Sequence, residues 1–235
     1  MRTGVLTCIS IVTLLFAAGA VPAVADANAD FKSANAAYDG GNYAEAERIC
    51  TGLLKADLSQ AGRASVFILR GIARNAQGKY AASVMDLTKA LPLADKANKG
   101  IIRFDRMLPL LSLEKFDDAY KDLLAMAQSY PAVVKDVTMR NVFAVGRHLL
   151  KNERHDDLLT LLLALKKTGY RGPDSLASTD YLYIYLVREL ADHKRADEAA
   201  PLIAEFTEYD ALLEHFAGSI TRSQRCGDSW RILAG

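Results

Sequence analysis

The chain has 235 residues, of which 29 are basic and 28 acidic, so its formal net charge is +1, and 51% of its residues are hydrophobic. This length is sufficient for a large core, either in one domain or in an array of repeats. The balance of charge argues against a nucleic-acid-binding protein, which would carry a basic surplus.

Residues 1–25 are predicted to be a cleaved secretory signal peptide. Arg2 supplies a basic start, the mostly apolar run Val5–Ala18 follows, and Ala23-Val24-Ala25 offers the small residues of a cleavage site. A membrane-spanning helix needs about 20 apolar residues, which is more than this run provides. An uncleaved N-terminal anchor is the alternative. We therefore expect residues 26–235 to be exported, to the periplasm or as a secreted protein, without spanning a membrane.

One kind of turn recurs along the chain. In each copy an aromatic residue follows the turn and a small residue comes three places later. The copies are Gly41-Asn42-Tyr43-Ala44-Glu45-Ala46, Gly78-Lys79-Tyr80-Ala81-Ala82-Ser83 and Glu114-Lys115-Phe116-Asp117-Asp118-Ala119. The aromatic residues are separated by 37 and 36 residues, and weaker copies follow at His155 and Ala196 after gaps of 39 and 41. Such a period indicates a repeat architecture.

Each turn lies between two segments of helix length. The segments before the turns are 30–39, 64–77, 101–113, 138–151 and 181–193. Those after the turns are 43–54, 80–91, 116–129, 156–167 and 197–206. A single helical hairpin cannot bury its apolar faces alone, so neighbouring hairpins are expected to stack.

Apolar residues recur seven and ten places after each turn aromatic, and this three-residue step returns to one face of a helix. They are Cys50, Leu53, Leu87, Ala90, Leu123, Met126, Leu162, Leu165, Ile203 and Phe206. Small residues recur nine places before the aromatic and three after it. They are Ala34, Gly71, Gly146, Ala46, Ser83, Ala119 and Ala199. We expect a continuous core stripe and a close approach of paired helices at the small residues.

The second unit resembles a tetratricopeptide repeat almost throughout, through Leu69-Arg70-Gly71-Ile72-Ala73, Gly78-Lys79-Tyr80 and Asp86-Leu87-Thr88-Lys89-Ala90-Leu91. The first unit does so through Ala34, Tyr38, Gly41, Tyr43 and Ala46, and the third through Phe116, Ala119 and Pro131. Residues 30–131 match the tetratricopeptide repeat pattern well, whereas residues 132–206 match it only in a degenerate form. The units are longer than the family's usual length of about 34 residues.

The resemblance implies an all-α fold, a solenoid of about five antiparallel helix pairs. The pairs are expected at about 30–60, 64–98, 100–131, 138–172 and 180–207, with a C-terminal capping helix and tail at 208–235. Two segments depart from the pattern. Pro109 falls inside an expected helix and would kink or shorten it, and 181–185 is aromatic and β-branched enough for a strand as the alternative to a helix.

The sequence contains no pattern that predicts a catalytic, metal or cofactor site. The four histidines lack a His-Glu-x-x-His spacing, and there is no Cys-x-x-Cys, Gly-rich phosphate loop or Gly-x-Ser-x-Gly. His148 and His155 are seven residues apart, and we favour packing or solvated roles over a metal pair. Cys50 and Cys226 lie far apart in a solenoid, beyond the ~7 Å that a disulfide tolerates. We expect both to be free or paired between chains, with Cys50 in the core.

In the resembled family, the first helix of each pair lines a groove that holds peptides or helices of partner proteins. Carried over to this chain, the groove-lining residues are Phe31, Asn35, Tyr38, Ile68, Ile72, Asn75, Phe104, Leu108, Phe143, Arg147, Ile184 and Arg188, with Leu111, Leu150 and Ala191 one turn further on. These residues are mostly apolar or aromatic, so they do not match the clamp of lysine and asparagine by which some relatives hold a terminal carboxylate. The alternative is that Phe104, Phe143 and Ile184 are simply buried core.

Three functions remain open. The leading prediction is a non-catalytic exported scaffold that binds an unidentified protein or peptide. The second is a self-assembling structural envelope protein, since residues 132–172 carry eight basic and four acidic side chains and residues 173–215 carry three basic and ten acidic ones. Opposite charges of this kind favour head-to-tail association. The third is an accessory or regulatory module of an envelope enzyme system.

Overall fold

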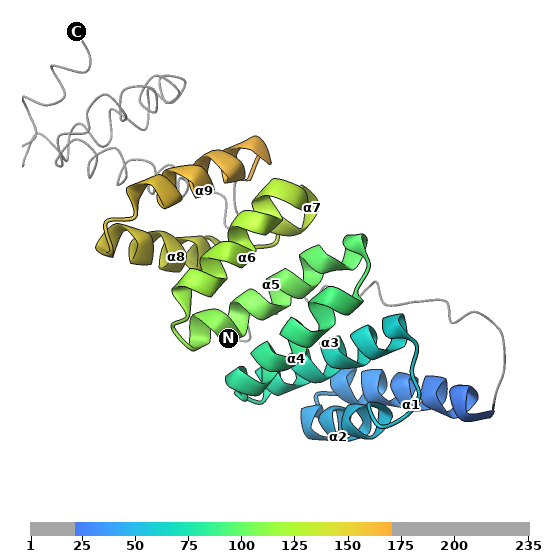
Figure 1. Cartoon of the computed structure of the whole chain (residues 1–235). Coiled ribbons are helices and arrows are strands. Elements are labelled where there is room, and N and C mark those ends of the chain that lie inside the picture. Colours follow the sequence, from blue (N-terminus) through green and yellow to red (C-terminus); the bar gives the residue numbers. More distant parts are fainter. Residues whose placement is uncertain (1–21, 171–235) are drawn as a thin grey trace, which may run out of the picture. The chain divides into compact units, whose positions relative to one another are not determined.

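The computed structural model describes residues 22–170, and this part of the chain consists of α-helices joined by turns (Figure 1). The helices are α1 (Pro22–Asp39), α2 (Tyr43–Leu53), α3 (Gln60–Ala76), α4 (Tyr80–Leu93), α5 (Lys96–Ser112), α6 (Phe116–Ser129), α7 (Pro131–Val134), α8 (Met139–Lys151) and α9 (His155–Lys167). The prediction of an all-α fold of helix pairs is confirmed. The expected fifth pair, the strand alternative at 181–185 and the C-terminal cap lie outside the described residues.

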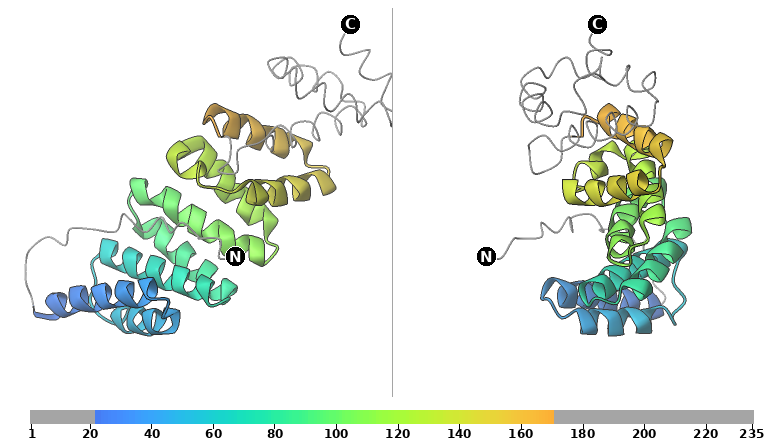
Figure 2. Two further views of the ribbon diagram at one scale, coloured as in Figure 1. Left: turned by 180° about the vertical axis from the view of Figure 1, so that it is seen from behind. Right: turned by 90° about the vertical axis from the view of Figure 1, so that its left-hand side faces the viewer.

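The chain divides into two compact units, residues 1–133 and 134–235. In the first unit α1 pairs with α2, α3 with α4 and α5 with α6, and each pair also contacts the next through α2 and α3 or α4 and α5. The hairpins follow one another as layers in both views of Figure 2. The second helix of each hairpin begins at the turn aromatic, at Tyr43, Tyr80 and Phe116, where the repeat pattern predicts it.

The first helices begin earlier than expected. α3 starts at Gln60 and not at Ala64, because the Ser59 hydroxyl accepts the Gly62 N–H at 3.1 Å and caps the helix. α5 starts at Lys96 and not at residue 101, because the Asp95 carboxylate accepts the Asn98 N–H at 2.9 Å. α1 starts at residue 22, where a proline suits the first helical position, and therefore runs through the predicted cleavage site.

Pro109 was expected to kink or shorten its helix, and the shortening does not occur. α5 continues through Pro109 to Ser112, and the Leu113 N–H still donates to the Pro109 carbonyl at 3.0 Å. A proline removes only its own donor, which would otherwise serve the carbonyl four residues earlier. Because Pro109 lies in the last turn of α5, the helix loses one hydrogen bond close to its end.

The hairpin turns share a left-handed residue two places before the turn aromatic. Gly41 and Gly78 occupy this position with φ of 78° and 74°, and Glu114 and Glu153 occupy it with φ of 56° and 55°. A left-handed backbone conformation raises the conformational energy of a residue that has a Cβ, whereas glycine adopts it with almost no increase in energy. The third and fourth turns therefore carry a strain that the first two avoid.

We expect Glu114→Gly to raise the free energy of unfolding by about 0.5–1 kcal/mol, because relief of the left-handed strain exceeds the added flexibility of the unfolded chain. Urea unfolding followed by circular dichroism measures the change. Lys115→Gly is the matched control, because φ at Lys115 is −82°, and it is expected to lower stability. A stabilisation by both variants would contradict this explanation.

The predicted core stripe is confirmed within the described residues. Its members there are all buried, namely Cys50, Leu53, Leu87, Ala90, Leu123, Met126, Leu162 and Leu165. The close approach expected at the small residues is seen at Gly71. A Cβ added at Gly71 would stand 2.8 Å from the Cγ of Leu87, so α3 approaches α4 more closely there than alanine permits.

Cys50 is a free thiol buried in the first hairpin. Burial raises its pKa to about 12, so almost none of it is the reactive thiolate at neutral pH. We expect Cys50 to resist a thiol reagent in the folded chain and to react fully in denaturant, measured in a variant with Ser at Cys8 and Cys226. Rapid stoichiometric labelling of the native protein would contradict the buried position.

A buried carboxylate ties the second hairpin together. Asp86 on α4 has a side chain that is 1% exposed, and it accepts two hydrogen bonds from Arg70 and one from Arg74, each 2.8 Å long. Arg70 also donates to the Thr51 hydroxyl at 3.2 Å, which joins α3 to the preceding hairpin. Both arginines lie on α3, so the carboxylate of Asp86 ties α3 to α4, and the bond from Arg70 to Thr51 ties α3 to α2.

The same arrangement recurs 36 residues later. Asp122 on α6 is fully buried and accepts hydrogen bonds of 2.7–2.8 Å from Arg103 and Arg106 on α5. Arg106 also donates to the Thr88 hydroxyl at 3.0 Å. Buried charges are tolerated when they are paired and hydrogen-bonded in this way. The central hairpins are thus joined by ionic contacts as well as by apolar packing.

A third carboxylate, Glu47 on α2, accepts from three donors of the second hairpin. Arg74 donates at 2.8 Å, Gln77 at 3.0 Å and Lys79 at 2.7 Å. Burial alone would raise the pKa of Glu47, but the hydrogen bonds from Lys79, Arg74 and Gln77 outweigh it and lower the pKa to about 2. Glu47 therefore stabilises the contact between the first and second hairpins at neutral pH.

The second unit is described for α8 and α9, which pair with each other. Its core is entirely aliphatic at the helix contact, with Val142, Val145, Leu149, Leu158, Leu161, Leu162 and Leu165 buried. The Tyr170 hydroxyl donates to the Val137 carbonyl and closes the end of the pair. His155 is buried at the position of the turn aromatic, as the packing interpretation predicts.

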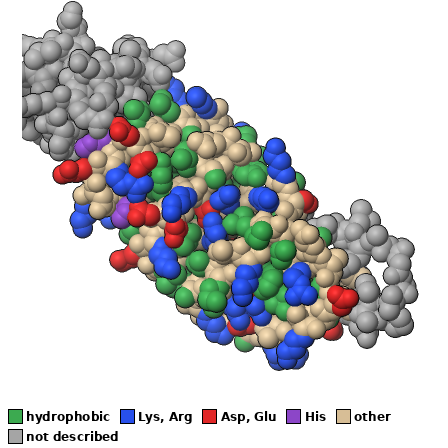
Figure 3. Space-filling model, viewed as in Figure 1, with side chains coloured by type: hydrophobic (Ala, Val, Ile, Leu, Met, Phe, Trp, Pro, Cys, Tyr) green, Lys and Arg blue, Asp and Glu red, His purple; other side chains and the backbone are tan. Residues whose placement is uncertain are grey.

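The described surface carries both hydrophobic and charged side chains. On the face drawn in Figure 3, hydrophobic side chains are separated by basic ones and by fewer acidic ones. Met85 on α4 is the one large hydrophobic residue of the described chain that is mostly exposed, at 59%. Among residues 22–170, none of the helices has the length and hydrophobicity needed to cross a membrane.

Candidate partner-binding groove

The first helices of the three hairpins share one side of the first unit. Besides contacting its neighbours in the chain, α3 contacts both α1 and α5. Successive first helices therefore lie against one another, which is the arrangement that places them on the inner side of a helical-repeat array. We define the groove surface as the side of α1, α3 and α5 that carries Phe31, Asn35, Tyr38, Ile68, Ile72, Asn75, Phe104, Leu108 and Leu111.

All nine residues of the groove surface are partly exposed. Phe31, Tyr38 and Ile72 pack against a core cluster that includes Ala34 and Cys50. Ile68 packs against another cluster, formed by Leu87, Ala90 and Ile102. These four side chains thus contact the core and are also partly open to solvent.

The groove surface is mainly apolar. Its two asparagines are Asn35 and Asn75, and the Asn35 amide donates to the Phe31 carbonyl of its own helix at 2.8 Å. None of the nine residues carries a charge. A surface of this kind can bind an apolar segment by removing hydrophobic area from water.

A carboxyl group lies beside this apolar surface. Asp105 follows Phe104 on α5, is partly exposed, and has no hydrogen bond or ion pair to any side chain of the described helices. Burial raises its pKa to about 7, because desolvation disfavours the charged form and no partner compensates. Asp105 is thus poised between its two protonation states near neutral pH.

The hydroxyl of Tyr38 shares this environment. Burial raises the pKa of Tyr38 to about 12, and the charge of Asp105 adds to the effect, followed by Tyr43 and Asp39. The ring of Tyr38 lies against that of Tyr43, with centroids 5.3 Å apart. The charge of Asp105 on α5 thus acts on Tyr38 on α1 in the same direction as burial.

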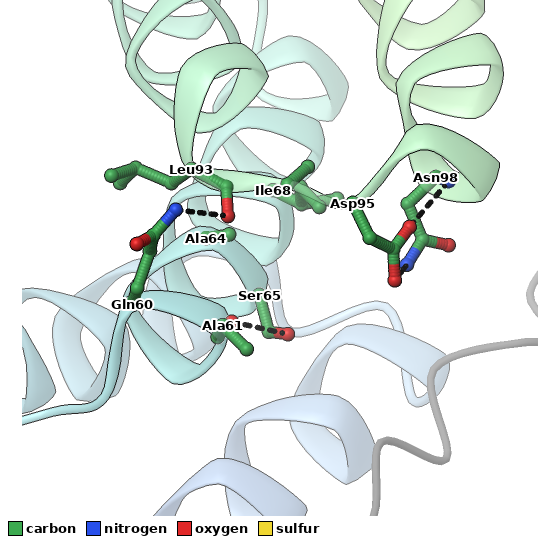
Figure 4. A pocket seen from close by; sticks show the side chains of 9 residues that line it. Gln60, Ala61, Ala64, Ser65, Ile68, Leu93, Asp95 and Asn98 are labelled. Atoms are coloured by element: carbon green, nitrogen blue, oxygen red, sulfur yellow. Dashed lines mark hydrogen bonds between the residues drawn. The ribbon is translucent and has the colours of Figure 1, made fainter.

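A pocket of about 270 Å³ opens at the beginning of α3 and α5 (Figure 4). Ile68 is shared with the groove surface, and the other walls include Ala64, Ser65 and Asn98. The Gln60 amide donates to the Leu93 carbonyl at 3.3 Å and closes one side. The polar groups drawn here bond within the protein, so the pocket extends the groove surface without adding a reactive centre.

The remaining predicted groove residues lie elsewhere. Phe143 and Arg147 are on α8 of the second unit, where Phe143 is partly buried and Arg147 is exposed. Ile184, Arg188 and the further position Ala191 lie outside the described residues. The structure thus places the nine predicted residues of α1, α3 and α5 on neighbouring first helices.

Sequence reasoning missed Asp105. It lies one place after the central groove position, and its equivalents one and two repeats earlier are Leu69, which is buried, and Lys32, which is exposed. An acid where a neighbouring repeat has a buried leucine is the signal that could have identified it. Within residues 22–170, no three His, Cys, Asp or Glu side chains converge as metal ligands would.

No family model and no curated protein matches the chain. One solved structure, MamA of AMB-1, matches 80% of this chain and 93% of its own with a TM-score of 0.50 and 19% sequence identity. MamA is a tetratricopeptide-like helical solenoid. At this identity the likeness shows the fold alone, and the fold is an all-α, tetratricopeptide-like solenoid.

Proposed function

We propose that this chain is a non-catalytic scaffold that binds a segment of another protein along the groove surface of α1, α3 and α5. The observation that carries the proposal is the groove surface itself, nine uncharged, mostly apolar and partly exposed side chains, four of which pack against the core. Side chains held at their base lose little freedom on binding, which favours affinity. A tetratricopeptide-like fold is consistent with protein partners.

We further propose that the scaffold acts outside the cytoplasm. The basic start, the apolar run and the small residues before Asp26 support this. Mass spectrometry of the protein isolated from its own cells tests it, with a mature chain beginning at or near Asp26 as the expected result. A full-length chain recovered from the cytoplasm would contradict export and would leave the groove proposal unaffected.

The groove proposal is tested by affinity capture from the native envelope with matched variants. Phe104→Glu places a charge in the centre of the groove surface, and Met85→Glu places the same charge on an exposed apolar residue of α4. We expect partners to be retained by the wild type and by Met85→Glu and lost with Phe104→Glu. Circular dichroism confirms that each variant is folded. Equal retention by Phe104→Glu and the wild type would refute binding through this surface.

Self-assembly remains the second candidate, supported by the opposite charge balance of residues 132–172 and 173–215. Light scattering of the mature chain at low and high salt distinguishes it. Charge-driven association should weaken as salt rises, because salt screens surface charges. A monomer under both conditions would remove this candidate.

A further inference from the structure

The three first helices all begin at one end of the first unit (Figure 1). The chain reverses between α1 and α2 and again between α2 and α3, so α3 runs parallel to α1. Ala27 near the start of α1 and Val66 near the start of α3 accordingly belong to one core cluster. The starts of α3 and α5 meet at the pocket, which Gln60 and Asn98 both line. The groove surface therefore has its pocket at the end where the chain enters α1.

The segment that precedes α1 matches this end of the groove surface in chemistry. We call Val5–Ala18 the leader segment; it contains no charged side chain, and apolar residues predominate in it. None of the nine groove residues is charged, and the pocket has an apolar wall that includes Ala64, Ile68 and Leu93. Contact between the two apolar surfaces removes both from water, which stabilises the contact.

The polar groups of the pocket favour an apolar occupant over a polar one, because they already bond to one another. The Ser65 hydroxyl donates to the Ala61 carbonyl at 3.1 Å, and the Asn98 amide donates to the Asp95 carboxylate at 3.2 Å (Figure 4). An apolar side chain can therefore enter the pocket without breaking a hydrogen bond.

The leader segment is also within reach of the whole groove surface. Only Gly19, Ala20 and Val21 separate it from Pro22, the first residue of α1. Three extended residues span at most about 10 Å, and the leader segment as a helix would extend about 21 Å. Packed helices lie about 10 Å apart, so this length covers the distance from α1 to α5. A short tether gives such a contact an effective concentration on the order of millimolar.

We propose that, in the uncleaved chain, the leader segment lies across the groove surface of α1, α3 and α5 and places an apolar side chain in the pocket. The inference rests on the proposed function, since the covered surface is the one that binds the partner. Hydrolysis of the Ala25–Asp26 bond by a signal peptidase, with water as the second reactant, releases the leader segment and opens the groove. Partner binding is thereby confined to the exported chain.

The first test is photo-cross-linking of the full-length chain made by cell-free translation without membranes, where no signal peptidase acts. A photoreactive phenylalanine analogue replaces Ile68, which lines both the pocket and the groove surface, or the exposed Met85. Mass spectrometry is expected to find position 68 joined to the leader segment of the same chain, with at least tenfold lower yield from position 85. The absence of this product, or equal yields from both positions, would overturn the inference.

Two variants of the uncleaved chain are matched controls. Leu15→Asp places a charge within the leader segment, and it should lower the cross-link yield from position 68 at least fivefold. Thr3→Asp places the same charge before the segment and should change the yield less than twofold. Equal yields from both variants would overturn binding through the apolar run. A mixture of isotopically light and heavy chains identifies the joined molecules, and products that join light to heavy chains would overturn the contact within one chain.

Partner capture separates this inference from the function on which it rests. With a signal peptidase inhibitor present, the mature chain is expected to capture its partner at least tenfold more efficiently than the uncleaved chain. If the two chains capture the partner equally, the groove proposal stands and the inference alone is overturned. If Phe104→Glu and the unaltered mature chain retain the same proteins, the groove proposal fails and the inference falls with it.

Discussion

Replacing Asp122 with alanine is expected to lower the free energy of unfolding by about 3–5 kcal/mol, since it leaves two buried or partly buried cations unpaired. Arg103 and Arg106, 28% and 17% exposed at their side chains, both depend on this carboxylate. Urea unfolding measures the change. Asp118→Ala is the control, because Asp118 makes an exposed pair with Lys121 at 3.1 Å, and it should cost less than about 1 kcal/mol.

The chain itself shows how the whole ionic cluster can be replaced. At the same places relative to the turn aromatic, the fourth hairpin has Val142, Val145 and Leu161, all fully buried. A triple variant that copies these residues, R103V/R106V/D122L, should be within about 1 kcal/mol of the wild type or more stable, because an apolar set replaces a buried ion cluster without leaving a charge. A triple variant as unstable as Asp122→Ala would show that the ionic contacts themselves are needed.

Asp105→Asn is expected to stabilise the protein increasingly as pH rises from about 4 to about 7. The folded pKa of Asp105 is about 7 and its ordinary value is 3.8. The folded chain therefore binds more protons than the unfolded chain between these values, and the stability of the wild type falls as pH rises through this window. Asparagine cannot ionise, so the variant avoids this loss.

The difference in unfolding free energy between Asp105→Asn and the wild type should grow by about 2 kcal/mol between pH 4.5 and pH 8. If Asp105 were fully buried, a pKa shift of this size would change the free energy of unfolding by about 4 kcal/mol. We expect a smaller change because water reaches the partly exposed carboxyl group. Urea unfolding at several pH values measures it, with Asp57→Asn as the matched control. A difference that stays constant with pH would mean that Asp105 is well solvated.

Much of the fold follows from local sequence patterns. The starts of α2, α4 and α6 were predictable because an aromatic residue after a turn and a small residue three places later occur together. The starts of α3 and α5 were not, because the caps Ser59 and Asp95 begin these helices four and five residues before the hydrophobic repeat becomes clear. A helix cap is a single side chain, so it produces no repeating hydrophobic pattern in the sequence.

The candidate site was predictable only in part. The groove residues of α1, α3 and α5 follow from the repeat register, and the structure brings these residues together. The ion clusters at Asp86 and Asp122 were missed, although their 36-residue spacing matches the repeat, because charged residues are assumed to face solvent. Asp105 was missed because the burial that raises its pKa comes from the packing of the stacked hairpins, which the residues adjacent in sequence do not reveal.

The most direct test of the groove is site-specific photo-cross-linking in the cells that make this protein. A photoreactive phenylalanine analogue replaces Phe104 in one strain and Met85 in another, so that the same group stands on the groove surface or on the exposed side of α4. We predict a specific cross-linked partner from position 104 and none from position 85. Cross-links from position 85 alone, or the same products from both positions, would contradict binding through the groove surface of α1, α3 and α5.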